Sequence, residues 1–436
     1  MEPGSHDTHP SAPPDDAPRA PGQLDRRRFL TGALAGGAAA TVAGYALGRS
    51  AGTEPPPAKP APPTTYSVFG RHQPGVTTPQ PAAGLVAAFK VGAKSRAGLA
   101  DTLKILTARA QDLMAGKAPP RQDGSVPPPD SGILGPAPVP EGLTVTVSVG
   151  ASLFDKRYGL VALRPKRLTR MPAFPNDDLD PARCHGDLLV QVCADHRDTV
   201  LHALRELRTA TAQMLTQRWM LEGFQRPNTL GPGQTSVRNL LGFKDGTANP
   251  DPRDQALMDR LVWVQPAGPE PAWAAGGSYQ VVRIIKNFVE RWDLTPLQVQ
   301  EEIIGRHRDS GAPLGRQREE EVPDFASDPL GQVTPPFAHI RLANPRTPAT
   351  EANRIQRRGF NYARDMDGPG QVDTGLLFIA YQQDLGRGFT TVQKRLNGEK
   401  LEEFIQPAGG GFFFTLPGAT APDGYLGDGL LAAAGP

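Results

Sequence analysis

The chain has 436 residues, and its 47 lysines and arginines against 45 aspartates and glutamates leave a formal net charge of +2. This balance gives no reason to expect nucleic acid as a partner, and the length allows one large or two medium-sized domains with a substantial core. Two cysteines are too few for a disulfide-dense secreted scaffold.

The first 52 residues are expected to be a signal region for export by the twin-arginine route. Arg26 and Arg27 are followed by Arg-Phe-Leu and then by a weakly hydrophobic, Gly- and Ala-rich stretch at 31–48. A transmembrane anchor is the alternative interpretation of that stretch, and no clear A-x-A cleavage site is visible. Proline-rich residues 53–65 predict a linker. We therefore expect a periplasmic, cell-surface or extracellular protein that is exported in the folded state. Proteins that take this route often carry a cofactor inserted before export.

Residues 66–249 alternate strand-like and helix-like segments. Apolar residues at 84–91 predict a strand, and residues 95–116 place an apolar stripe on one face of a helix. The members of this stripe are Leu99, Leu103, Leu106, Ala110 and Leu113. A loop rich in Pro and Gly follows at 115–141.

Two further strands and a helix are expected in the same half. In 143–150 valines alternate with threonine and serine, as in a half-buried strand, and 186–194 repeats the pattern. A helix that Asp198 or Thr199 can cap is expected to follow and to run through 202–214. Cys184 and Cys193 lie beside and within this apolar run. They are interpreted as buried small hydrophobic residues, with a disulfide or a metal pair as the alternatives.

The second half, residues 250–432, repeats the alternation. Its expected elements are strands at 278–288, 374–384 and 411–417 and helices at 297–306 and 388–405, the first of them opened by Thr295-Pro296. Strand–helix–strand units given twice predict an α+β fold made of two sandwiches, each an antiparallel sheet with helices packed on one face.

The segment GFKDGTANP contains a carboxylate, Asp245, between two glycines, Gly242 and Gly246. A tight turn is the plain interpretation of Asp-Gly. However, the small residues that follow would let the backbone approach a flat ligand closely while the carboxylate points over it.

His339 in HIRLANPR and Arg357 in QRRG complete a set with Asp245. A histidine among apolar neighbours is more often a core residue with satisfied hydrogen bonds. A neutral imidazole can also hold a haem iron from one side, while a carboxylate and a guanidinium on the other side can move a proton and hold the charge that develops when a peroxide is split.

These motifs, together with GLLFIAYQQDLGRGFTTVQKRLNGE, resemble the dye-decolourising peroxidases, and within them the exported branch also described as deferrochelatase/peroxidase. The resemblance extends from about Tyr66 to Leu430. It implies two ferredoxin-like domains, 66–249 and a haem-binding domain at 250–432, with haem b between them.

The activity implied by the resemblance is the oxidation of dyes, phenols or other organic reductants by hydrogen peroxide through an oxoferryl intermediate. The alternative is an exported haem-binding deferrochelatase that serves iron acquisition, with iron-uptake components as partners. A homo-oligomer is compatible with either function.

Position by position, the resemblance assigns the iron ligand to His339 and the catalytic pair to Asp245 and Arg357. The carboxylate that accepts the imidazole N–H is expected to be Glu403, with Glu402 as the second choice. Arg357 also counts among the haem contacts, and the others implied are Gly246, Thr247, Ala248, Asn344, Pro345, Arg346 and Phe378.

Bulky dyes could not reach a buried haem, so electron transfer from surface tyrosine or tryptophan residues is a further expectation. Trp219, Trp292 and Tyr381 are the candidates, with an ordinary core position as the alternative for each.

Overall fold

The computed structural model describes residues 64–120, 124–226, 237–366, 370–420 and 423–435. The expected twin-arginine motif, the stretch at 31–48 and nearly all of the expected linker lie outside these residues. Within them, no helix has both the length and the hydrophobicity that crossing a bilayer requires.

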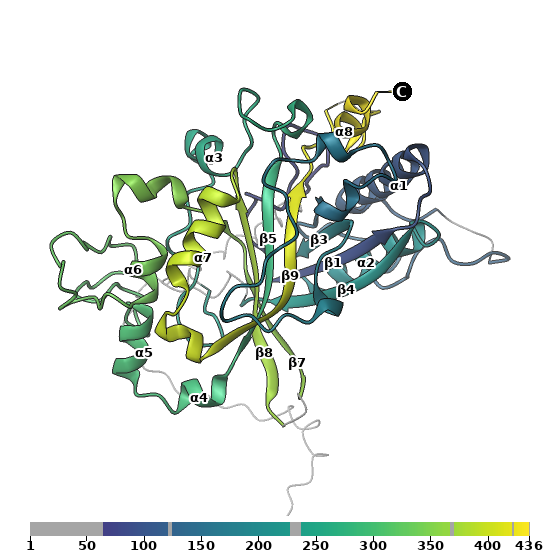
Figure 1. The fold of residues 1–436 in the computed structure, drawn as a ribbon. Helices are drawn as coiled ribbons and strands as arrows, with labels where there is room; N and C mark the ends of the chain where they lie inside the picture. The colour runs from purple at the N-terminus through teal and green to yellow at the C-terminus, as the bar shows by residue number, and fades with distance from the viewer. Residues whose placement is uncertain (1–63, 121–123, 227–236, 367–369, 421–422, 436) are drawn as a thin grey trace, which may run out of the picture. The chain divides into compact units, whose positions relative to one another are not determined.

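The first half of the chain forms a four-stranded antiparallel sheet in the order β2-β3-β1-β4, with two helices packed on it (Figure 1). This order and connectivity are ferredoxin-like. The elements are β1 (Ala83–Val91), α1 (Arg96–Met114), β2 (Thr144–Gly150), β3 (Leu188–Ala194), α2 (Arg197–Ala210) and β4 (Leu215–Phe224).

Helix α1 shows why these segments fold as they do. The Ser95 hydroxyl accepts a hydrogen bond from the Gly98 N–H and caps the first turn. All five apolar residues of the predicted stripe are buried, which confirms the helix and the face that packs on the sheet.

The second half repeats the topology, with strand order β9-β5-β8-β7. Two-residue β6 pairs with β8 just beyond the end of β7. The strands and α-helices of this half are α3 (Gln255–Leu261), β5 (Ser278–Asn287), α4 (Val289–Asp293), α5 (Leu297–Ile304), α6 (His339–Ala343), β6 (Gln356–Arg357), β7 (Phe360–Met366), β8 (Val372–Gln382), α7 (Thr391–Leu396), β9 (Ile405–Thr415) and α8 (Asp428–Ala433).

The two sheets are joined at both edges. Strand β2 pairs with β9, and β4 pairs with β7 at Phe224 and Asn361. Because β5 also pairs with β8, eight strands form a closed ring around an interior that holds Trp219, Phe360 and Tyr381.

The closed ring corrects the expectation of a half-buried strand at 143–150. Every residue of β2 is buried, and two of its three hydroxyls, those of Thr146 and Ser148, make hydrogen bonds inside the fold. Thr146 donates to the Pro74 carbonyl, and Ser148 donates to Gln280. The alternating threonine and serine residues of this strand therefore mark hydroxyls that bond to buried partners, and not a solvent-facing side.

The helix expected at 388–405 is broken into two pieces. Helix α7 ends at Leu396, and a short 3-10 turn covers Lys400–Glu403. Between them Gly398 has φ 80°, a left-handed conformation that glycine adopts at little cost and that ends the helix. This break decides which carboxylate reaches His339.

The segment that contains Asp245 makes its hydrogen bonds with the second half. Arg238 donates to the carbonyls of Arg308 and Asp309, and Asn249 bonds to Arg357. The boundary expected at 249/250 stays a prediction, and these bonds favour a boundary before Val237.

Candidate active site

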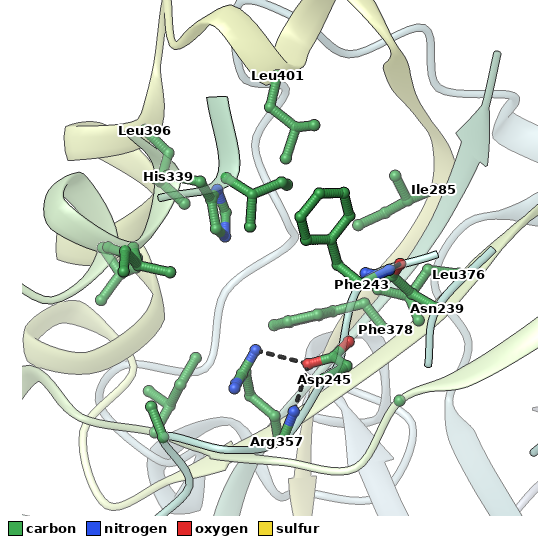
Figure 2. A pocket seen from close by; sticks show the side chains of 18 of the residues that line it. Asn239, Phe243, Asp245, Ile285, His339, Arg357, Leu376, Phe378, Leu396 and Leu401 are labelled. Carbon is green, nitrogen blue, oxygen red and sulfur yellow. Dashed lines mark hydrogen bonds and ion pairs between the residues drawn. The ribbon is translucent and has the colours of Figure 1, made fainter. Parts of the chain in front are cut away.

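A cavity of about 300 Å³ lies against the second sheet. Its floor is made by β5 and β8, and its walls by α6, α7 and the segment that contains Asp245 (Figure 2). Much of the lining is apolar, and it includes Leu241, Phe243, Ile285, Leu376, Phe378, Leu396 and Leu401. Such walls suit a flat, largely apolar ligand.

On one side of the cavity, His339 is the first residue of α6. Its Nδ1 lies 2.8 Å from Oε2 of Glu399, whose side chain is only 4% exposed. With Nδ1 engaged, Nε2 is the nitrogen left for a metal ion. Burial opposes protonation of the ring, but the charge and hydrogen bond of Glu399 outweigh it and raise the pKa of His339.

The prediction that Glu403 accepts the His339 N–H is wrong, because Glu399 is the acceptor. The turn at Asn397-Gly398 separates Glu399 from α7 and lets its side chain point at α6. Glu402 lines the cavity without bonding to His339. Glu403 accepts a hydrogen bond from Arg291 through its backbone carbonyl.

On the opposite side of the cavity, Asp245 and Arg357 form an ion pair (Figure 2). Arg357 Nη1 donates to Asp245 Oδ1 at 3.0 Å, and the two side chains are 30% and 25% exposed. Gly246, with φ 93°, makes the turn that aims the carboxylate inward, and its N–H donates to Asp245 Oδ1. The structure thus brings the three predicted residues together around one space.

The loop that contains Asp245 is anchored by hydrogen bonds to Glu319. Glu319 accepts a hydrogen bond from the Thr247 hydroxyl and one from the Lys244 ammonium, both at 2.7 Å. Gly246, Thr247 and Ala248 all line the cavity, as expected for close backbone approach to a ligand.

One edge of the cavity carries excess positive charge. Arg346 has φ 56°, which is unusual for a residue other than glycine, and its buried Nε has no hydrogen-bond partner. Burial lowers the pKa of Arg346, and burial together with the charge of Arg346 lowers the pKa of Arg306 to about 10. A ligand with carboxylates at this edge would offset the cost of these buried cations.

Asn344 also lines this edge, but Pro345 does not, so the expected contact with Pro345 finds no support. An imidazole on one side, apolar walls and a cationic edge together fit haem, whose two propionates would lie beside Arg346 and Arg306.

The prediction that electron transfer starts from three candidate residues at the surface is wrong, because all three are buried. Trp219, Trp292 and Tyr381 are 6%, 1% and 0% exposed, and each makes a side-chain hydrogen bond within the protein. Trp292 alone among the three packs edge-on against a cavity residue, Phe243.

Both cysteines are free and buried, as predicted. Among the described residues, no group of three or more His, Cys, Asp and Glu side chains is arranged to hold a metal ion. The alternative of a disulfide is thereby removed for Cys184 and Cys193.

Comparison with known families identifies the architecture. The model of the Dyp-type peroxidase N-terminal domain matches residues 73–225, and that of the C-terminal domain matches 236–420. The chain belongs to the Dyp-type peroxidase family.

Individual relatives and solved structures agree with this assignment. The chain is 52% identical to a deferrochelatase of Yersinia pestis bv. Antiqua over 84% of each chain, and 51% identical to a deferrochelatase of Escherichia coli over 83% of this chain and 86% of that one. Ferric DtpA from Streptomyces lividans is similar in structure, with a TM-score of 0.76 and 36% identity over 85% of this chain and 98% of that one.

The protein is accordingly a haem peroxidase that uses hydrogen peroxide and a reductant, with the two-part ferredoxin-like α+β fold of its family. Sequence reasoning missed Glu399, Arg306 and Asn249 at its cavity. The Asn-Gly pair before Glu399 was the available signal for the first of these, since it predicts a turn.

Proposed function

We propose that the cavity binds haem b, with His339 Nε2 on the iron and with Asp245 and Arg357 acting on peroxide at the opposite face. One observation carries this proposal: the His339–Glu399 pair and the Asp245–Arg357 pair lie on opposite sides of one largely apolar cavity (Figure 2). Asn344 and Arg346 at the cationic edge, and Phe378 on the sheet, would complete the haem contacts.

The bound haem would supply the iron and the electrons that reduce peroxide. Asp245 would take the proton from one peroxide oxygen and return it to the leaving oxygen. Arg357 stays protonated at any physiological pH, so its guanidinium would provide a fixed positive charge for the leaving oxygen. Phe243 and its apolar neighbours would keep bulk water from this step.

Haem b is the form of haem that the pocket favours. Neither Cys184 nor Cys193 lines the cavity, so no thiol is in place for a thioether bond to a vinyl group. Extraction with acidic organic solvent should therefore release the whole pigment as protohaem. Pigment that stays with the protein would contradict this.

Glu399→Gln is expected to lower haem affinity or peroxidase activity by about 10–100-fold, since a partner of a metal-binding imidazole sets its orientation and basicity. The midpoint potential of the iron should also rise, because a less basic imidazole stabilises the ferric state less. Glu403→Gln is the matched control and should leave both the potential and the affinity unchanged. Equal effects of the two substitutions would contradict the role of Glu399.

A second function is favoured by the names of two relatives described above, which are deferrochelatases at 51–52% identity. Under this alternative the protein would remove iron from haem and serve iron acquisition together with uptake components. Such a role needs His339 and the cavity but not a preserved Asp245–Arg357 pair. Incubation of the haem-loaded protein with a ferrous chelator distinguishes the two, because intact fluorescent protoporphyrin would appear only with iron removal.

We propose export by the twin-arginine route, on the basis of Arg26-Arg27 and the stretch that follows. Changing both arginines to lysine should retain the protein in the cytoplasm, because the route recognises this pair. Fractionation of cells that produce either form provides the measurement, and unchanged export of the double variant would exclude the route. A homo-oligomer remains a prediction for light scattering to test.

A further inference from the structure

Asn249 is bound to the backbone of Arg357 through both ends of its side-chain amide. Its Nδ2 donates to the Arg357 carbonyl at 2.8 Å, and its Oδ1 accepts from the Arg357 N–H at 3.2 Å. Strand β6 is only two residues long and pairs with β8 along one edge. On the other edge, Asn249 takes the place that a neighbouring strand would occupy.

Asn249 also belongs to the turn that holds Asp245. The Asn249 N–H donates to the Gly246 carbonyl at 2.9 Å, and the Gly246 N–H donates to the Asp245 carboxylate at 2.7 Å. Glu319 holds the same turn from behind through Thr247. One short turn therefore carries the carboxylate at its start and the attachment to the Arg357 backbone at its end.

The ion pair alone is a weak tether. Asp245 and Arg357 are 25% and 30% exposed, and a partly hydrated pair with a long arginine side chain gains little net stability. By contrast, the two amide hydrogen bonds fix the backbone of Arg357, so that its guanidinium starts from a set position relative to the carboxylate.

We infer that Asn249 is a positioning residue that sets the register of Arg357 against Asp245. It acts through Arg357 and does not itself contact the peroxide. The inference rests on the proposed roles of Asp245 and Arg357.

The chain offers a matched control in Gln73, whose amide makes the same pair of bonds to the backbone of Val147. Gln73 Nε2 donates to the Val147 carbonyl at 2.8 Å, and its Oε1 accepts from the Val147 N–H at 2.9 Å. Gln73 does not line the cavity. Loss of the Gln73–Val147 hydrogen bonds should therefore affect stability without affecting the Asp245–Arg357 pair.

The test uses the haem-loaded protein and compares three single variants, Asn249→Ala, Gln73→Ala and Arg357→Ala. Two double variants combine Arg357→Ala with Asn249→Ala or with Gln73→Ala. Stopped-flow mixing gives the rate with peroxide, and titration of the ferric protein with cyanide gives a binding constant that does not depend on turnover. Asn249→Ala should slow the peroxide reaction by about 10–100-fold, since a displacement near 1 Å has that effect. Asn249→Ala should also weaken cyanide binding. Gln73→Ala should leave both the peroxide rate and the cyanide affinity within about twofold of the parent values.

The double variants decide the mechanism. In the Arg357→Ala background, Asn249→Ala should cause no further loss of rate or of cyanide affinity, because its effect passes through Arg357. Additive effects would overturn the inference, as would an Asn249→Ala protein that matches the parent in both measurements.

Asn249→Asp provides a second variant if Asn249→Ala does not fold. It keeps the size and the acceptor for the Arg357 N–H but loses the donor to the Arg357 carbonyl, so reduced rate and affinity are again expected. A parent protein that does not react with peroxide would refute the proposed function, while the cyanide titrations would still test Asn249.

Discussion

His339→Ala should yield a protein that has lost most of its haem. Loss of a hydrogen-bond partner behind a metal ligand typically costs about 10–100-fold in affinity, and loss of the ligand itself should cost more than that. The cavity would remain, but without a nitrogen to hold iron on the side of α6. The haem content of the purified protein, from the ratio of the Soret band to the protein band, provides the measurement.

His307→Ala is the matched control for this result. His307 also has a carboxylate beside its Nδ1, with Glu301 Oε2 at 3.0 Å, but it does not line the cavity. Its variant should keep full haem content. Full occupancy and an unchanged spectrum in His339→Ala would refute the assignment of the iron ligand.

Arg357→Ala and Asp245→Asn should both slow the reaction with peroxide at the active site. Removing one preorganised charge donor costs about 10²–10³ in rate, or roughly 3–4 kcal/mol, which is the loss expected for Arg357. Loss of a proton-transfer group costs about 10²–10⁴, so Asp245→Asn should fall in that range at neutral pH. Stopped-flow mixing of each variant with peroxide measures these rates.

Arg341 offers a control for the distal pair, since it also forms an ion pair, with Asp328 at 3.3 Å, and neither residue lines the cavity. Arg341→Ala should react with peroxide at the parent rate. If Arg357→Ala and Asp245→Asn both stayed within about threefold of the parent, the proposed mechanism would be wrong and the haem-handling function would take its place.

Local patterns in the sequence were sufficient to predict several elements of this fold. The apolar stripe of α1 and the apolar runs of β1 and β5 each match an element of the structure. Strand β4 was missed because charged and polar residues interrupt its pattern, with only part of the strand buried.

Long-range closure of the ring had no signal in the sequence. The hydroxyls of Ser148 and Thr415 lie 2.9 Å apart although 267 residues separate them. Without that contact, the threonine and serine positions of β2 could only be interpreted as solvent-facing. Tertiary pairing thus decided the environment of these residues, as is common for strands.

The active site followed the same division between local and distant information. Local sequence motifs that could be matched residue by residue contain His339, Asp245 and Arg357, and the structure brings these three residues around one cavity. Glu399 was missed because a continuous helix at 388–405 was expected, and the turn at Gly398 ends that helix. Glu319 lies in a stretch without regular elements, where periodicity predicts nothing.

The most direct test of the central claim is an optical spectrum of the purified protein before and after one equivalent of hydrogen peroxide. We expect the Soret band of a ferric haem with a histidine ligand, and a change in that band within the mixing time. We further expect that an added organic reductant restores the first spectrum. A protein with no Soret band after reconstitution with haem, or a haem spectrum that peroxide leaves unchanged, would contradict the account.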